Sequence, residues 1–316
     1  MHKLIRFYYQ NRLKVWAIIL AIIFVISIIQ VMNNFASKKL EEQNEEYSQE
    51  TTSKNVVSYD KESEAIISGD KVPSQYRKDF GELIDQFFTY CIEHQPQLAY
   101  NLLSKETKEV LYPTEQLFEE LYYSEKFEGD KQFSFNSWLI RGRLYIYQVK
   151  IFDNMLTTGK SDDTYYQDFV TICPEEGEYK LNINSLIGIK NINQEYNNDF
   201  LSIKVIKSNV FMDYENYTFD IKNKSEKTLK LDSGKDTDNV YLVDKGGIRY
   251  SALLYENAEE DLIINPNETK RINIKFSDAY QEGIVIKKIV FEDIVTNYEE
   301  YKDGEESKTE KFEMKF

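Results

Sequence analysis

Histidine and cysteine are scarce in this sequence of 316 residues. It contains 2 histidines and 2 cysteines and has no CxxC motif. Zinc sites are built mainly from these side chains, so we expect no zinc site. Ser/His/Asp and Cys/His catalysis also need a histidine. His94 is the only one beyond residue 2, and its place at the end of a predicted helix favours a structural role. We therefore expect neither an enzyme nor a cofactor.

The two cysteines leave two interpretations open. Cys91 and Cys173 each lie in an apolar segment, which favours two buried free thiols. A disulfide between them is the alternative outside the cell, where oxidising conditions preserve such bonds.

Glycine and proline are also infrequent, at 12 and 5 residues. These low counts argue against collagen-like and proline-rich disordered chains. Apolar residues make up 41% of the sequence and aromatic residues 14%, which is enough for real hydrophobic cores. The length accommodates one or two domains besides any membrane anchor.

Basic residues are fewer than acidic ones, at 39 against 54, and the formal net charge is −15. Residues 1–14, which we predict to be a cytoplasmic tail, contain four basic and no acidic side chains, so the remainder carries −19. A body this acidic repels phosphate backbones, and nucleic acid is not an expected partner.

One long apolar run occupies residues 15–32. It carries no charge, and at about 1.5 Å per residue it just spans the hydrocarbon core of a bilayer. We predict a single-pass transmembrane helix in the cell membrane, and the basic tail places the N-terminus in the cytoplasm and the body outside. A cleaved signal peptide is the alternative, but residues 33–37 lack a small-x-small cleavage site.

Residues 33–77 are polar and rich in Glu, Ser and Thr. Such a segment buries too little apolar surface to offset its ordering entropy, so we predict a flexible stalk. The apolar residues from Phe80 to Cys91 then follow helical spacing and form a single stripe. Pro96 and Thr114 mark the starts of a second and a third helix.

After Gly129 the apolar period changes to two. Tyr179, Leu181 and Ile183 alternate with polar residues, which is typical of antiparallel strands with one solvated face. Three helices followed by such a sheet, over residues 78–192, resemble the cone-shaped α+β fold of the nuclear transport factor 2-like superfamily. Segment 97–104 and the Tyr112-Pro113-Thr114 run with Phe118 look like the second and third helices of its extracytoplasmic bacterial members. Its enzymes commonly place an Asp, His or Tyr in the cone. No predicted strand holds a His, so no catalytic residue is carried over.

Residues 196–316 repeat strand patterns without helical interruption. Seven or eight short strands with turns between them favour a β-sandwich. The Pro266-Asn267-Glu268-Thr269 turn before an alternating strand resembles immunoglobulin-like domains of Gram-positive surface proteins. The predicted fold is therefore α+β: an N-terminal transmembrane helix, a nuclear transport factor 2-like cone domain and an all-β immunoglobulin-like sandwich.

Two groups of residues are candidate sites. Four side chains share one predicted strand face that could line a concavity for a ligand or partner; the alternative is an exposed face or one covered by a helix. They are Arg141, Arg143, Tyr145 and Tyr147. A second group offers oxygen ligands for calcium, although Lys235 opposes binding and a solvated loop is the alternative. Its members are Asp232, Asp236 and Asp238.

The leading functional hypothesis is a non-enzymatic, membrane-anchored interaction or assembly component of the cell envelope. An anchor followed by a nuclear transport factor 2-like domain is similar to scaffold subunits of conjugative and type IV secretion machines, which is an argument from fold analogy. One alternative is a small-molecule or peptide sensor that uses the cone as its pocket, and another is an adhesin-like module. An open apolar cavity inside the cone favours ligand binding, whereas a filled one favours assembly.

Overall fold

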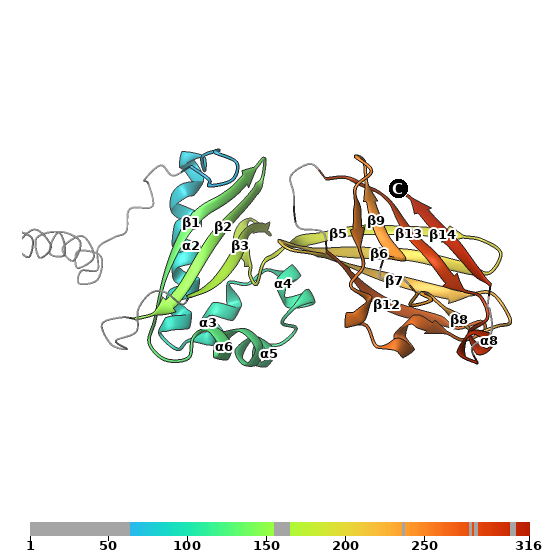
Figure 1. Ribbon diagram of the computed structural model, residues 1–316. Helices are drawn as coiled ribbons and strands as arrows, with labels where there is room; N and C mark the ends of the chain where they lie inside the picture. The colour runs from blue at the N-terminus through green and yellow to red at the C-terminus, as the bar shows by residue number, and fades with distance from the viewer. Residues whose placement is uncertain (1–63, 155–164, 236–237, 278–279, 281–283, 304–307) are drawn as a thin grey trace, which may run out of the picture. The chain divides into compact units, whose positions relative to one another are not determined.

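The structure is a computed structural model that describes residues 64–316, except 155–164, 236–237, 278–279, 281–283 and 304–307 (Figure 1). The predicted tail at 1–14, the predicted membrane span at 15–32 and most of the predicted stalk lie outside the described residues.

The predicted α+β balance of helix and sheet is wrong. Strands hold 47% of the described residues and helices 24%, so the described chain is mainly β-sheet. None of the described helices is both long and apolar enough to cross a bilayer. The longest described helix, α2 (Ser74–Ile92), is 19 residues long and carries charged side chains along its solvent face.

Residues 64–73 belong to the folded body, although their polar sequence predicted a stalk. The N–H groups of Ile66 and Ile67 donate to the carbonyl oxygens of Ser137 and Trp138 at 3.0 and 2.8 Å. Ala65 and Val72 are buried. The first described residues therefore pair with the edge of the first sheet instead of leading away from it.

The helical stripe predicted from Phe80 to Cys91 is confirmed in α2. All the predicted apolar positions are buried on one side of this helix. The next helices are short: α3 (Pro96–Asn101), α4 (Lys105–Val110) and a continuous run of α5 (Glu115–Phe118), the π-helix η1 (Glu119–Tyr123) and α6 (Ser124–Lys126). Side chains of Ser104 and Thr114 cap α4 and α5, because each accepts a hydrogen bond from the backbone N–H three residues later.

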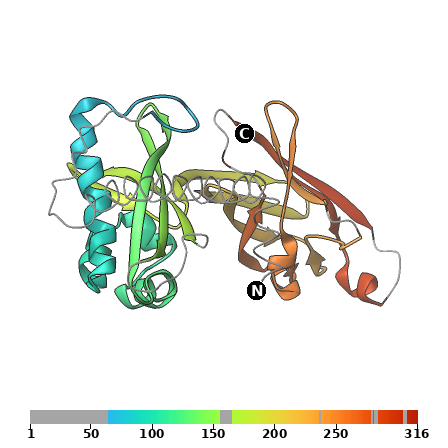
Figure 2. The ribbon, with the colours of Figure 1, turned by 60° about the vertical axis from the view of Figure 1, so that its left-hand side comes forward.

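The first sheet is antiparallel, with strand order β1-β2-β3-β4. Its strands are β1 (Lys131–Arg141), β2 (Leu144–Asp153), β3 (Tyr165–Glu175) and β4 (Glu178–Asn182). Helix α2 runs along one face of it, as two views show (Figures 1 and 2).

Aromatic side chains fill the space between this sheet and its helices. Phe118 stacks on Tyr122 with ring centroids 5.5 Å apart, and Phe87 meets Phe118 edge-on at 6.2 Å. Phe88 packs on Phe133 of β1 at 5.3 Å. Phe87, Phe88, Phe118 and Tyr122 have no solvent exposure. The interior of this part is thus a packed core.

Two further sheets follow. One has the order β12-β7-β6-β5, and the other runs β10-β9-β13-β8-β11 with β14 also paired to β13. The strands are β5 (Leu186–Asn197), β6 (Leu201–Phe211), β7 (Glu215–Asn223), β8 (Leu229–Lys230), β9 (Val240–Asp244), β10 (Arg249–Ser251), β11 (Ile263–Ile264), β12 (Thr269–Phe276), β13 (Ile286–Val295) and β14 (Thr309–Lys315). Short helices η2 (Leu254–Glu256), η3 (Glu259–Leu262) and α8 (Tyr298–Lys302) connect them.

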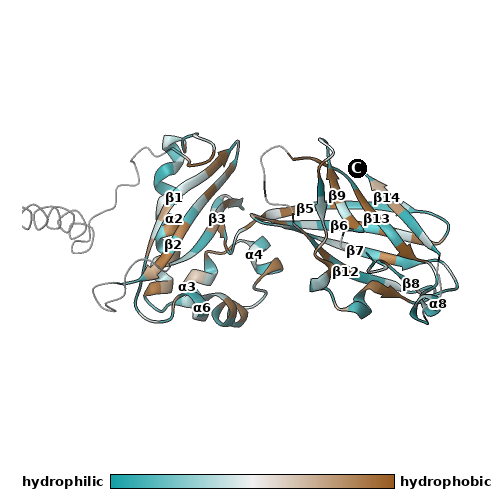
Figure 3. Ribbon diagram, in the orientation of Figure 1, coloured by the Kyte–Doolittle hydropathy of each residue, from teal (hydrophilic) through white to brown (hydrophobic). Residues whose placement is uncertain are grey.

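These two sheets share one core. Phe219 of β7 meets Phe291 of β13 edge-on at 6.0 Å, and both side chains are fully buried. Apolar and polar residues alternate along the strands, as their colours show (Figure 3), which is the pattern of sheets with one buried face. The predicted domain boundary at residues 192–196 falls inside β5, which starts at Leu186.

Candidate functional site

The four residues predicted to form one binding face do not share one exposed surface. Tyr145 and Tyr147 are 7% and 5% exposed and lie in the core beneath the helices. The ring of Tyr145 is 4.9 Å from that of Phe80 on α2. Arg141 ends β1 and Arg143 belongs to the following turn, and both are exposed. Tyr145 therefore packs α2 against the sheet, and Tyr147 contacts Phe135 of β1 with ring centroids 6.0 Å apart.

Local backbone geometry explains this difference. Strands β1 and β2 are joined by a two-residue turn with Gly142 at its first position, where φ is 57°. Ile140 thereby pairs with Tyr145 across the hairpin and shares its face. A register shift between Ser137 and Leu139 changes the alternation once more. The prediction that Arg141, Arg143, Tyr145 and Tyr147 share one face assumed that side chains alternate without interruption along residues 138–147, and the turn and the register shift break that alternation.

The structure describes two of the three carboxylates of the predicted calcium loop. Asp232 is buried and accepts a hydrogen bond from Asn239 Nδ2 at 2.9 Å. Asp238 is exposed and accepts one from Ser251 Oγ at 2.7 Å. Asp236 lies outside the described residues. Within the described ranges, no three His, Cys, Asp or Glu side chains are grouped so that they could hold a metal ion.

Nucleophilic groups are poorly placed for catalysis. Cys91 and Cys173 are both free, as the favoured sequence interpretation has it. Burial raises the pKa of the Cys91 thiol, and it raises that of Cys173 to about 12. Neither thiol ionises near neutral pH, so neither is an activated nucleophile. His94 is exposed after α2, and its Nδ1 lies 2.6 Å from the hydroxyl of Tyr123.

The most deeply buried carboxylate is Asp168, on β3. It accepts hydrogen bonds from the Tyr122 hydroxyl at 2.7 Å and from the N–H groups of Asn184 and Ser185 at 3.0 and 2.9 Å. Asn184 and Ser185 have φ of 54° and 63°, a conformation that L-residues adopt rarely. Asp168 thus stabilises the sharp turn between β4 and β5, which is a structural task.

Burial raises the pKa of Asp168, and this sets a pH dependence. Below the unfolded-state pKa the carboxyl group is protonated in both states. As the pH rises from about 4, the unfolded chain ionises first, so the free energy of unfolding falls until the pH passes the raised pKa of the folded state. We expect the stability difference between wild type and Asp168→Asn to decrease over this range, as urea titrations at several pH values would show. A difference that is constant or grows with pH contradicts this assignment.

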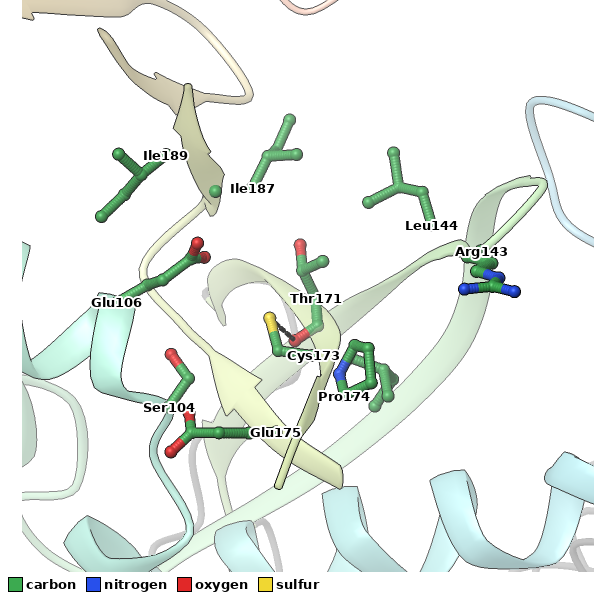
Figure 4. Close-up of a pocket in the computed structure, with 12 residues that line it drawn as sticks. Ser104, Glu106, Arg143, Leu144, Thr171, Cys173, Pro174, Glu175, Ile187 and Ile189 are labelled. Carbon is green, nitrogen blue, oxygen red and sulfur yellow. Dashed lines mark hydrogen bonds between the residues drawn. The ribbon is translucent and has the colours of Figure 1, made fainter. Parts of the chain in front are cut away.

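A pocket of about 540 Å³ opens beside the first sheet. Four elements contribute to it: α4 and its N-cap, the β1–β2 turn with the start of β2, β3, and the start of β5. Glu106, Thr171 and Ile187 surround the same space (Figure 4). Its other walls include Leu144, Cys173 and Ile189. Arg143 also lines it and is the one predicted binding residue that does so.

A buried hydrogen-bond network supports one side of this pocket. Asn182 of β4 is fully buried, and its Oδ1 accepts hydrogen bonds from the hydroxyls of Ser104 and Thr107. Its Nδ2 donates to Glu106 Oε2 at 3.0 Å and to the Ile187 carbonyl at 3.2 Å. Asn182 thereby fixes α4 and β5 against the sheet, and it orients the Glu106 carboxylate.

This arrangement suits binding better than chemistry. The pocket combines the carboxylates of Glu106 and Glu175, the guanidinium of Arg143, hydroxyl groups and an apolar wall, and its one thiol has a raised pKa. Sequence reasoning did not identify the pocket. Ser104 followed by Thr107 is a readable N-cap signal, but its contact with Asn182 spans 78 positions and leaves no local pattern.

Comparisons with known proteins add little. No protein-family model and no curated protein matches this chain. Among solved structures, a 2.2 Å crystal structure of a conserved hypothetical protein from Bacillus anthracis is similar, with 13% identity over 38% of this chain and 94% of that chain. The TM-score is 0.24. At that value the similarity carries no argument about fold or function, and both family resemblances stay predictions.

Proposed function

We propose that this protein is a non-enzymatic interaction or assembly component of the cell envelope that works by binding another protein. The observation that supports this most is the filled interior of the first part, where the rings of Phe87, Phe118 and Tyr122 occupy the space between helices and sheet. A sensor that encloses its ligand in that interior would need room there. The location outside the cell membrane stays a prediction.

Exposed apolar side chains supply a surface for such binding. Ile248, Val285 and Phe316, here called the hairpin patch, are 59%, 50% and 36% exposed. The Val285 carbonyl accepts a hydrogen bond from Lys245 N–H in the β9–β10 turn, three residues before Ile248. Val285 and Phe316 line the same hollow of about 370 Å³. Grouped apolar exposure of this kind is typical of protein interaction sites.

Site-specific photocrosslinking in cells tests this function. A photoreactive residue replaces Val285 in the patch, and a matched control replaces Lys222, which is exposed on β7. We expect a discrete protein adduct from position 285 and none from position 222, because only the first position faces a bound partner. Adding Ile248→Asp should abolish the adduct, since a carboxylate is costly to bury in an apolar interface.

Two outcomes contradict the proposal. One is equal labelling from positions 285 and 222, which would indicate random collisions. The other is an absence of adducts from position 285 in protein whose circular dichroism matches the wild type.

A further inference from the structure

We propose that the pocket between α4, β3 and β5 binds a small primary amine with an apolar body, with Glu106 as the counter-ion of the ammonium group. This site is separate from the hairpin patch and does not depend on the proposed function. The ligand class follows from the charge, the hydrogen-bonding capacity and the shape of the pocket.

The charge comes from Glu106. Its side chain is half-buried, and its Oε2 accepts the hydrogen bond from Asn182 Nδ2. Across the residues that the structure describes, no lysine, arginine or histidine forms an ion pair with it. The nearby Lys105 pairs instead with Glu175 and Glu176. A partly desolvated carboxylate without a cation attracts a positively charged group, because pairing offsets its desolvation cost.

The hydrogen-bonding capacity comes from Thr171. This residue is 2% exposed, and its hydroxyl is buried without a hydrogen-bond partner within the described chain. Buried hydroxyls are nearly always hydrogen-bonded, so an unpaired one beside a pocket indicates a missing partner. In Figure 4 its side chain points into the space beside Ile187. Thr171 also pairs with Asn182 across β3 and β4, and Asn182 holds Glu106. Both residues line the pocket, and an ammonium group has three donors, enough for a carboxylate and a hydroxyl together.

The shape favours a small ligand with an apolar body. The side chains of Leu144, Ile187 and Ile189 form the wall opposite Thr171. The volume lies within the range of small-molecule pockets. A Cβ atom at Gly188 would lie 3.4 Å from Glu106 Oε2, in van der Waals contact with the carboxylate. A branched side chain at this position would therefore take up space beside the Glu106 carboxylate.

NMR titration of the full chain with n-hexylamine tests the site. We expect saturable shifts of the Ile187 and Ile189 methyl signals, and no comparable shifts with hexan-1-ol, which has the same chain length and no charge. Glu106→Gln should weaken binding about tenfold because it removes the charge-assisted hydrogen bond. The glutamine oxygen can still accept from Asn182, so the network that supports α4 remains.

Two further variants make the test decisive. Gly188→Val should abolish the shifts by filling the pocket without changing its charge. Glu93→Gln, which removes an exposed carboxylate after α2, should leave the affinity unchanged. Equal binding of hexylamine and hexan-1-ol, equal affinity of wild type and Glu106→Gln, or an absence of shifts in wild type each overturns the proposal.

Discussion

Replacing Phe219 with alanine is expected to lower the free energy of unfolding by about 4 kcal/mol. Phe219 is fully buried between the two sheets of the second part, where its ring contacts those of Tyr217 and Phe291 at 6.1 and 6.0 Å. The substitution removes apolar surface from the core and leaves a cavity that the paired strands of both sheets can close only partly. Urea denaturation followed by circular dichroism measures the effect.

A matched control is Tyr255→Ala, since Tyr255 is an aromatic residue with 81% exposure. Its expected change is below about 0.5 kcal/mol. Similar losses for the two variants would show that Phe219 does not carry the contact between the sheets.

The Asp168→Ala variant is expected to lose about 3 kcal/mol of stability. Removing the carboxylate leaves the buried Tyr122 hydroxyl and the Asn184 N–H without this acceptor, whereas the Ser185 N–H keeps the Phe169 carbonyl at 3.1 Å. The turn at Asn184 and Ser185 also loses the group that stabilises its left-handed backbone. Thermal and urea unfolding of the variant measure the loss.

The Tyr122→Phe variant separates the contribution of the hydroxyl contact from that of the turn at Asn184 and Ser185. It removes one hydrogen bond to Asp168 and keeps the ring in the core, so we expect a loss of only about 1 kcal/mol. If Tyr122→Phe lowers the free energy of unfolding as much as Asp168→Ala does, the contact of the hydroxyl with Asp168 accounts for the whole effect and the turn contributes nothing.

The periodicity of apolar residues within single elements correctly predicted which side of an element is buried. The stripe from Phe80 to Cys91 is the buried face of α2. Within residues 196–316, where strands were predicted, the alternating residues Tyr217, Phe219 and Ile221 are the buried face of β7. Both patterns arise within a single element, where side-chain direction depends on backbone geometry alone. No contact with the rest of the chain is needed to read them.

Properties that depend on the relation between elements were not predictable. The face of Tyr145 was misassigned because one turn and one register shift lie between it and Trp138. The predicted balance of helix and sheet was wrong because residues 94–126 form short helices, whereas several strands reach ten or more residues. Asp168 also gave no signal, since its three donors come from η1 and the β4–β5 turn.

The candidate pocket was invisible for the same reason. Glu106 and Thr171 are ordinary residues in their own segments, and only the pairing of β3 with β4 and the contact of Asn182 with α4 bring them to one place. The predicted binding residues Arg141, Tyr145 and Tyr147 instead followed a pattern that belongs to the core and to a strand end.

The pairing of residues 66–67 with the edge of β1 gives the body a mechanical property. Tension that enters the folded body at residue 64 meets the hydrogen bonds of Ile66 and Ile67 before it reaches α2. Two backbone bonds, the hydrogen bond from Ile140 N–H to Ser68 Oγ at 3.1 Å, and the burial of Ala65 and Val72 resist it there. This segment is therefore expected to detach at a lower force than any that unfolds the core, and its release would lengthen the chain while α2 stays on the sheet.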